Sequence, residues 1–192
     1  MAEVSALQMA LIALVIVMAI FLPLAIYAAR YKKVPPDKAM VVYGRAFEGG
    51  RGYKVYSGGG RWIRPIIEAY EFLPLDVRTL DLVVAEIVTD VKLSGAKVNI
   101  KAVAQVLISD DPDTLRTAAS QLLHKKDVQI DEIALKTLEG HVRGICATLS
   151  IEQINSERDA VASQVQGLAA NDLKNIGLEI RSFVIKEIED ER

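Results

Sequence analysis

The sequence has a single cysteine among its 192 residues, only two histidines, and a net charge of only -2. One cysteine excludes a disulfide framework and a zinc site built from several thiolates. The near-neutral charge argues against nucleic acid as a partner, since nucleic-acid binding needs a basic surface. A disordered chain is excluded as well, because 51% of the residues are hydrophobic. This composition is typical of a small membrane-attached protein with a folded domain.

Charge is absent from a long stretch near the N-terminus, residues 4–29. A helix needs about 20 apolar residues to cross the hydrocarbon layer of a bilayer. A soluble core helix would carry a polar side chain at every third or fourth position, and this segment does not. We therefore expect a membrane-embedded helix. The side chains expected to contact lipid include Leu7, Leu11, Leu14, Val17, Phe21 and Leu24.

A cleaved signal peptide is the alternative to a permanent anchor. Signal peptides begin with basic residues, whereas the only charged residue before the apolar segment is Glu3. Pro23 lies inside the segment, and a proline there is compatible with a kinked span or with a re-entrant bend. The sequence leaves open whether the chain crosses the membrane once or forms a hairpin within one leaflet.

Basic and aromatic residues follow the apolar segment directly. Arg30, Lys32 and Lys33 lie at its C-terminal end, so the positive-inside bias places the following domain on the cytoplasmic side of the cell membrane. Tyr27 and Tyr31 flank the same end, where amphipathic rings favour the headgroup level. We expect these five residues to contact the membrane.

Charge changes sign along the rest of the chain. Residues 30–64 contain nine basic and two acidic residues, hence +7, whereas residues 65–192 contain fourteen basic and twenty-two acidic residues, hence -8. Because anionic lipid attracts basic segments, residues 30–64 are predicted to lie against the membrane surface. Five aromatic residues of this stretch have a second interpretation as strand residues that pack a core. They are Tyr43, Phe47, Tyr53, Tyr56 and Trp62.

Strand patterns dominate residues 39–108, after a stiff connector at Val34–Asp37 that contains two prolines. Residues 39–44 and 53–56 are rich in strand-forming residues, and glycine turns are expected at 49–50 and 58–60. Alternation is clearest from Val98 to Ile108, where the even-numbered residues are apolar, and Leu80, Leu82 and Val84 alternate likewise. A hairpin turn near Ser94–Gly95 would pair these runs in an antiparallel sheet with one covered face.

Helix patterns follow the strands. Asp111 and Pro112 are predicted to begin a short helix that carries Leu115, Ala119 and Leu122. Apolar residues at three- and four-residue spacing predict a second helix from Ile130 to Leu149, and Ser150 with Gln153 resembles a capping box. A third helix over 158–175 should end at Gly177, before an extended run over 178–188. Its expected buried residues are Val161, Val165, Leu168 and Leu173. This order predicts an α+β domain.

Catalytic and cofactor patterns fail their tests. The glycines at 58–60 are followed by Arg61 and Trp62 rather than by the lysine and hydroxyl residue of a phosphate loop. His141 and Cys146 would point about 140° apart on a helix, too far to share a metal ion. Cys146 is expected to be a buried apolar residue and not a nucleophile. We therefore predict no catalytic residue, no cofactor, no metal and no enzymatic activity.

Two further groups of residues are better explained by a structural role than by a binding site. Asp110, Asp111 and Asp113 fit the start of a helix better than a carboxylate site, because acidic groups favour that end of a helix. Gly140 and Gly144 are predicted to allow close packing on the sheet, with a self-association face as the alternative.

Longer stretches resemble a known family. "YKKVPPDKAMVVYGR" after an apolar N-terminus, "GGGRWIRPIIEAYEFLPL" and "KVNIKAVAQVLISDDPDTLRTAASQLL" are similar, in order and spacing, to the entry and central strand of a flotillin-type SPFH domain, of the band 7 or prohibitin superfamily. The stretch "LEGHVR" and the later "NSERD" resemble its helical half. The resemblance runs from about Tyr31 to Ile188.

The resemblance implies a function. Flotillins are membrane scaffolds without known catalysis that assemble into large homo-oligomers and organise lipid microdomains. Prokaryotic members often associate with NfeD-like membrane proteins. The alternative is a regulatory subunit of a membrane protease or channel, as in the related stomatins and prohibitins. The family's domain normally continues into a long coiled coil, and this chain stops at Glu189–Arg192, where that helix should begin.

The expected organisation has three parts. Residues 1–33 form a membrane anchor with a basic end, residues 34–110 the β-rich part of the SPFH domain nearest the membrane, and residues 111–192 its helical part with a final strand. The expected partners are membrane lipid and further copies of the chain.

Overall fold

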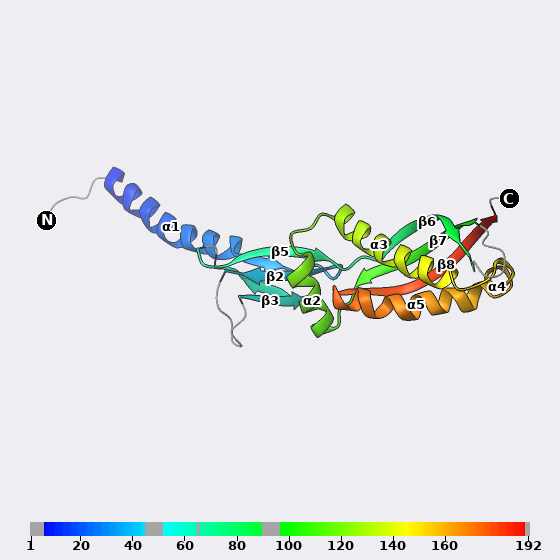
Figure 1. The fold of residues 1–192 in the computed structure, drawn as a ribbon. Coiled ribbons are helices and arrows are strands. Elements are labelled where there is room, and N and C mark those ends of the chain that lie inside the picture. The colour runs from blue at the N-terminus through cyan, green and yellow to red at the C-terminus, as the bar shows by residue number, and fades with distance from the viewer. Residues whose placement is uncertain (1–5, 45–51, 65, 90–96, 191–192) are drawn as a thin grey trace.

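The computed structural model describes residues 6–44, 52–64, 66–89 and 97–190. These residues form five helices and eight strands in an elongated molecule, with helix α1 at one end and the C-terminal strand reaching the other (Figure 1). An apolar N-terminal helix followed by antiparallel sheets and packed helices confirms the predicted α+β class.

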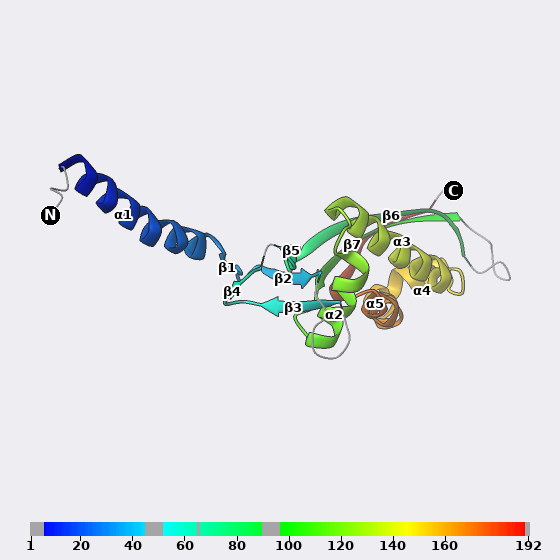
Figure 2. The same cartoon turned by 90° about the vertical axis from the view of Figure 1, so that its left-hand side faces the viewer.

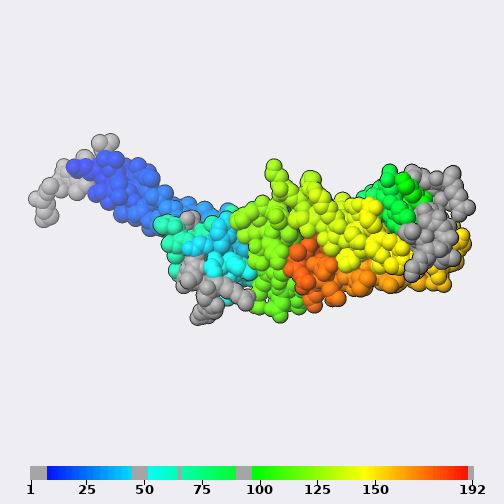
Figure 3. Space-filling view, in the orientation of Figure 1, coloured from blue at the N-terminus to red at the C-terminus, as the bar shows by residue number. Residues whose placement is uncertain are grey.

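Helix α1 (Ala6–Ala29) projects away from the domain (Figure 2). It continues through Pro23 as one helix, although proline has no N–H to bond the carbonyl four residues earlier. Every side chain described in it, from Gln8 to Ala29, is exposed. The space-filling view shows the same isolation, with α1 joined to the rest only at its base (Figure 3).

A short ribbon connects α1 to the domain. Strand β1 (Tyr31–Lys33) pairs antiparallel with β4 (Gly60–Trp62), and the Val34 amide donates to the Gly59 carbonyl at 2.8 Å. Gly58 and Gly59 have φ values of +76° and +80°, which side chains other than glycine rarely adopt. The predicted glycine turn at 58–60 is thus confirmed, whereas the one expected at 49–50 lies outside the described residues.

The first sheet has the order β3-β2-β5, with β2 (Lys38–Tyr43) between β3 (Tyr53–Ser57) and β5 (Ala69–Pro74). The central strand is buried on both faces because successive side chains point to opposite sides. Ala39 and Val41 join the main core, while Met40 and Val42 form a small second core. The residues that complete the second core include Val34 and Ile63, next to the β1–β4 ribbon.

The second sheet is formed by β6 (Arg78–Val88), β7 (Lys97–Ile108) and β8 (Leu178–Asp190), in that order. Both pairings are antiparallel, so the predicted chain reversal between the first two strands is confirmed, although its turn at 94–95 lies outside the described residues. The alternation predicted for β7 is confirmed as well, since its even-numbered side chains are buried.

Four helices complete the domain, and two of them, α3 (Asp127–Cys146) and α5 (Arg158–Asn175), cover one face of the second sheet (Figure 2). Helix α2 (Pro112–Leu122) begins as predicted, with the Asp111 carboxylate accepting from the Thr114 amide at 3.0 Å. The hydrogen bonds from Thr114 lower the pKa of Asp111. Helix α4 (Ile151–Ser156) begins with the predicted capping box of Ser150 and Gln153.

The buried face of α5 differs from the prediction at Leu168, whose side chain is 51% exposed. Ala162 and Ala169 are buried instead, together with the expected Val161, Val165 and Leu173. The buried face is centred near Ala162, Val165 and Ala169, and Leu168 lies about 90° from that centre around the helix. Small alanine side chains therefore form much of the contact that the apolar pattern alone assigned to leucine.

Gly177 connects α5 to β8 where only glycine fits. Its φ is +90°, which confirms the predicted left-handed end of the helix. A Cβ atom at this position would also lie 2.4 Å from the backbone of Ala118 in α2. The tight connection brings α2, α5 and β8 together.

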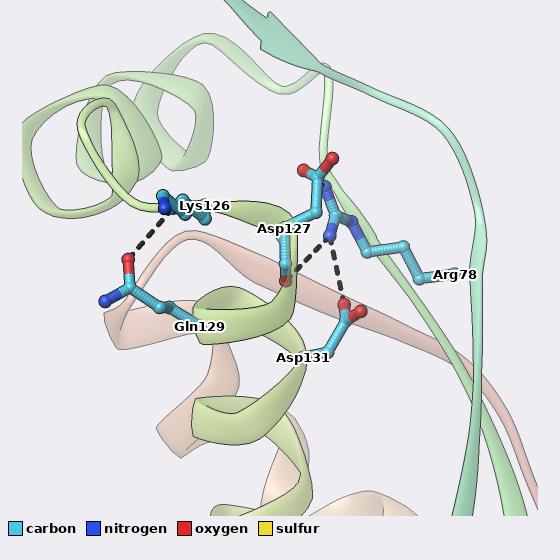
Figure 4. A network of polar contacts seen from close by, with 5 residues as sticks. All are labelled: Arg78, Lys126, Asp127, Gln129 and Asp131. Carbon is cyan, nitrogen blue, oxygen red and sulfur yellow. Dashed lines mark hydrogen bonds and ion pairs between the residues drawn. The ribbon is translucent and has the colours of Figure 1, made fainter.

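Arg78 links the start of β6 to the start of α3 (Figure 4). Its guanidinium donates to the Asp127 carboxylate at 2.5 Å, to the Asp127 carbonyl at 3.2 Å and to the Asp131 carboxylate at 3.0 Å. Burial lowers the pKa of Arg78, but the hydrogen bonds to the two aspartates outweigh burial, so the pKa is raised. The network fixes α3 across the connection between the two sheets.

We expect Arg78→Gln to lower the free energy of unfolding by about 1–2 kcal/mol, because it removes charge-assisted hydrogen bonds from a side chain that is only 12% exposed. The exposure of Asp127, 72%, moderates the loss. Chemical denaturation of the full chain in detergent, followed by circular dichroism, measures it. The matched control is Arg116→Gln, which breaks an exposed pair with Asp113 and should cost less than about 0.5 kcal/mol. Equal losses for both variants would contradict the linking role of Arg78.

Candidate membrane interface

Helix α1 is long and apolar enough to cross a membrane. Its 24 residues extend about 36 Å, compared with roughly 30 Å of hydrocarbon in a bilayer. The residues predicted to contact lipid are exposed around the helix, except that the side chain of Leu7 lies outside the part described. The exposed ones are Leu11, Leu14, Val17, Phe21 and Leu24.

Aromatic side chains gather at the foot of α1. The ring centroid of Trp62, in β4, lies 3.6 Å from that of Tyr27 and 5.8 Å from that of Tyr31. The Ile63 amide donates to the Arg30 carbonyl at 3.3 Å, which brings the end of β4 to the end of α1. Trp62 remains 37% exposed, so the group has an apolar body and an accessible edge, as interfacial aromatic residues do.

Basic side chains lie beside this aromatic group. Lys32 and Lys33 follow Tyr31 in β1, and the Lys32 ammonium lies 6.0 Å from the centre of the Tyr70 ring. The Arg61 guanidinium lies 4.1 Å from the centre of the Tyr56 ring. Both distances fit cation–π contact, so Lys32 and Arg61 of the ribbon each contact an aromatic ring of the first sheet.

The other aromatic residues of this stretch have partners inside the domain. The Tyr53 hydroxyl donates to the Arg116 carbonyl of α2 at 3.2 Å, and the Tyr43 ring meets His124 edge-on at 5.9 Å. Tyr56 packs on the second core. Tyr53 and Tyr56 fit the core-packing interpretation, since both pack against a core, whereas the ring contact of Tyr43 is with the exposed His124. Phe47 lies outside the described residues. The part of residues 30–64 that adjoins α1 is the β1–β4 ribbon with Ile63 and Arg64.

A shallow crevice of about 350 Å³ lies between α1 and the end of β4. Residues from both elements line it: Pro23, Ile26, Tyr27, Arg30, Trp62, Ile63 and Arg64. The sequence alone allowed two interpretations of Trp62, and no pattern in it singled out Arg64. The turn after Arg64 also exposes Ile66, at 89%, and Ile67. The one available signal was the position of the chain's single tryptophan beside two arginines, Arg61 and Arg64.

The side chains elsewhere that could take part in catalysis or bind a metal ion lie apart from one another, and several of them have a charged partner. His141 lies 2.9 Å from the Asp172 carboxylate, and His124 lies 3.0 Å from that of Glu71. No three histidine, cysteine or acidic side chains in the described ranges are placed to hold a metal ion. Asp111 caps α2 and Asp113 pairs with Arg116 at 3.0 Å, as a helix start requires.

Gly140 and Gly144 do not pack closely on the sheet. Both lie on the exposed side of α3, and a Cβ atom at either position would meet nothing within 4 Å. The predicted close packing is therefore wrong, because the buried side of the helix is formed by the larger residues Leu138 and Val142. The glycines lie on the opposite, solvent-facing side.

Cys146 is fully buried at the end of α3, as expected. Burial raises the pKa of its thiol to about 11, because the thiolate would lose its hydration.

We expect Cys146 to be nearly inert at pH 8, where only about one thiol in a thousand is ionised. Labelling by a maleimide should be at least about a hundredfold slower than for an exposed cysteine introduced by Ser163→Cys, and should accelerate as the pH rises toward 11. Guanidinium should make the two rates equal. Fast labelling of Cys146 in the native protein would show that the thiol is accessible and would contradict its burial.

Comparison with known proteins agrees with this architecture. The model of the SPFH domain / Band 7 family matches residues 32–192. Flotillin-2 of Carassius auratus is 37% identical over 158 residues, which is 82% of this chain and 36% of that protein. The flotillin-like protein FloT of Bacillus subtilis is 31% identical over 175 residues, 87% of this chain and 34% of that protein. Human Flotillin-1 is 33% identical over 159 residues, 82% of this chain and 36% of that protein.

The chain thus spans about a third of the length of these relatives. The matched region begins at β1 and covers both sheets and the helices that pack on them. On the extent of these matches, the chain belongs to the SPFH domain / Band 7 family and is similar to the flotillins within it.

Proposed function

We propose that this protein is a flotillin-like scaffold that α1 anchors in the cell membrane, with the SPFH domain on the cytoplasmic leaflet, where copies assemble and organise lipid. The observation that carries the proposal is the helix itself. None of its described side chains is buried, and it adjoins the SPFH domain through the ribbon that holds Trp62 against Tyr27. A scaffold needs this combination of firm attachment and a domain free to meet its neighbours.

The course of α1 favours a single span over a re-entrant hairpin. The helix passes Pro23 without a break, and its length matches the hydrocarbon thickness. Arg30, Lys32 and Lys33 follow its C-terminal end, and the charge bias of membrane proteins retains such residues in the cytoplasm. Tyr27, Tyr31 and Trp62 would then lie at the headgroup level.

The second sheet offers surfaces for assembly. Its outer strands, β6 and β8, are 11 and 13 residues long and are edges of the sheet, so each has a row of backbone groups available for pairing. On the face away from α3 and α5, Val83 and Val184 are exposed, and Val103 lies opposite Val184. We propose that these three valines are the apolar part of a contact surface, since apolar patches on protein surfaces are typical of contacts between proteins.

The described residues favour a binding role over catalysis. The histidines are paired with exposed carboxylates, the cysteine is buried, and the paired aspartates serve helix α2. We therefore propose that the domain acts through surfaces and not through chemistry.

Charging the middle of α1 should abolish membrane attachment. Each arginine at the centre of a membrane helix costs about 2.5–3.5 kcal/mol, so Leu14→Arg combined with Val17→Arg should release the full chain from membranes washed at alkaline pH. Wild-type protein should remain in the pellet. The amount of protein in the pellet and the supernatant gives the result.

The matched control introduces the same charges at exposed apolar positions of α3 and α5, Val128→Arg with Leu168→Arg, and should stay attached. A wild-type chain that washes off, or an α1 variant that stays attached, would contradict the anchoring role of α1.

The side of the membrane needs a separate test. Ser163→Cys introduces an exposed cysteine that reacts with an impermeant maleimide, and it should be labelled only after the cells are opened. Labelling in intact cells would place the domain on the other side.

Assembly should depend on the outer face of the second sheet. Val83→Glu combined with Val184→Glu places like charges on that face, and we expect it to convert the oligomers of the full chain in lipid nanodiscs to single copies. Mass photometry measures the number of copies. Val128→Glu with Leu168→Glu adds the same charge elsewhere and should leave the oligomer intact. A monomeric wild type would rule out self-assembly of this chain, and an unchanged double variant would exclude this face.

A further inference from the structure

The crevice at the foot of α1 combines an apolar wall with two cations. Pro23, Ile26 and Tyr27 contribute one side, and Trp62 with Ile63 the other. Its volume of about 350 Å³ falls at the small end of the roughly 300–1,000 Å³ that is usual for sites of small molecules. The crevice therefore has room for part of a lipid, such as its headgroup and the beginning of one acyl chain.

Both arginines of the crevice lie near the C-terminal end of α1. Pro23 and Arg30 are seven residues apart, about 10 Å along the helix axis. Trp62 pairs with Tyr31, and the Ile63 amide donates to the Arg30 carbonyl, so Arg64 follows on the α1 side of Ile63. The crevice therefore brings apolar side chains, two aromatic rings and two arginines together.

Neither guanidinium at this end has a carboxylate partner among the described residues. Other arginines of the domain do have one: Arg78 pairs with Asp127, Arg143 with Glu139 and Arg181 with Glu179. Arginine binds phosphate through two parallel hydrogen bonds, and it gives up hydration more readily than lysine does. Two exposed arginines beside an apolar wall form a recognition element for a phosphate that carries a hydrocarbon chain.

The position of α1 sets the depth of the crevice. When the helix spans the bilayer, its last two turns lie where hydrocarbon gives way to headgroups. Pro23 and Ile26 then adjoin the acyl chains, and Arg30, which follows the end of α1, lies near the phosphates, where Arg64 lines the same crevice. The crevice therefore offers apolar contact and positive charge to the two chemically different parts of a phospholipid.

We propose that this crevice binds one anionic phospholipid of the surrounding leaflet, with its phosphate between Arg30 and Arg64 and the beginning of an acyl chain against Pro23 and Ile26. The inference rests on the proposed function, because it requires α1 to be in the membrane. It adds selectivity: the scaffold would hold one negatively charged lipid at each anchor instead of sampling the bilayer evenly.

The chain's single tryptophan allows a direct test, because Trp62 lines the crevice. Full-length protein is reconstituted into phosphatidylcholine vesicles that contain a minor fraction of brominated lipid, a contact quencher of indole fluorescence. In one set the brominated lipid is phosphatidylglycerol, and in the other it is phosphatidylcholine. We expect stronger quenching by brominated phosphatidylglycerol, with an enrichment of about fivefold for each arginine that contacts it.

Two double variants separate a built site from general attraction. Arg30→Gln with Arg64→Gln should abolish the preference for the anionic lipid, whereas Lys32→Gln with Lys33→Gln removes the same charge from the neighbouring strand and should retain most of it. Excess inorganic phosphate in the buffer should leave the preference unchanged. Equal quenching by both lipids, an equal loss in both double variants, or competition by phosphate would each overturn the proposal.

Failure of the anchor gives a different result from failure of the site. If α1 is not in the membrane, vesicles made entirely of brominated phosphatidylcholine will leave Trp62 unquenched. If α1 is anchored and the crevice is not selective, those vesicles will quench Trp62 strongly, while the two dilute lipids quench it alike.

Discussion

The structure depends on where an uncharged helix of 24 residues can be stable. Burying a leucine, isoleucine, valine or phenylalanine side chain contributes about 1.5–3 kcal/mol, and α1 buries none of those described in it against its own domain. Water is therefore an unfavourable surrounding for it, and lipid is the favourable one. The other features of this end of the molecule follow from the need to connect such a helix to the folded domain.

The connection is short and firm. The chain leaves α1 at Ala29 and enters a strand at Tyr31, and β4 pairs with that strand and brings Trp62 back to Tyr27. Below it, the second core holds the β1–β4 ribbon against the first sheet through Val34 and Ile63. The Arg78 network then fixes α3 beside the start of the second sheet. These contacts extend the domain away from α1, so only its small end adjoins the helix (Figure 1).

Local patterns in the sequence predicted much of this fold. The uncharged segment identified α1, strict alternation identified β7, and the positions of Asp111, Ser150 and Gly177 marked helix ends, because each of these signals arises within a few residues. The foot of α1 was harder. Trp62 meets Tyr27 only because β4 pairs with β1 across about thirty residues of chain, and no pattern in one sequence specifies that pairing. Arg64 lines the same crevice because it follows β4 directly, and its position also depends on that pairing.

Helix faces were predicted less well than helix positions. Leu168 is apolar and correctly spaced, yet it lies at the edge of the contact that Ala162 and Ala169 form. Gly140 and Gly144 were predicted to allow close packing on the sheet, but they lie on the side of α3 that faces solvent. Which side of a helix meets the sheet depends on the whole core, so residues near the boundary can lie on either side.

If α1 is the anchor, it lies in lipid while the SPFH domain stands outside the bilayer. Electron microscopy of the full chain in lipid nanodiscs would locate both. We expect density for α1 across the bilayer, the β1–β4 ribbon at the headgroups, and the second sheet far from the membrane. Density for α1 packed against a protein surface outside the bilayer would contradict it.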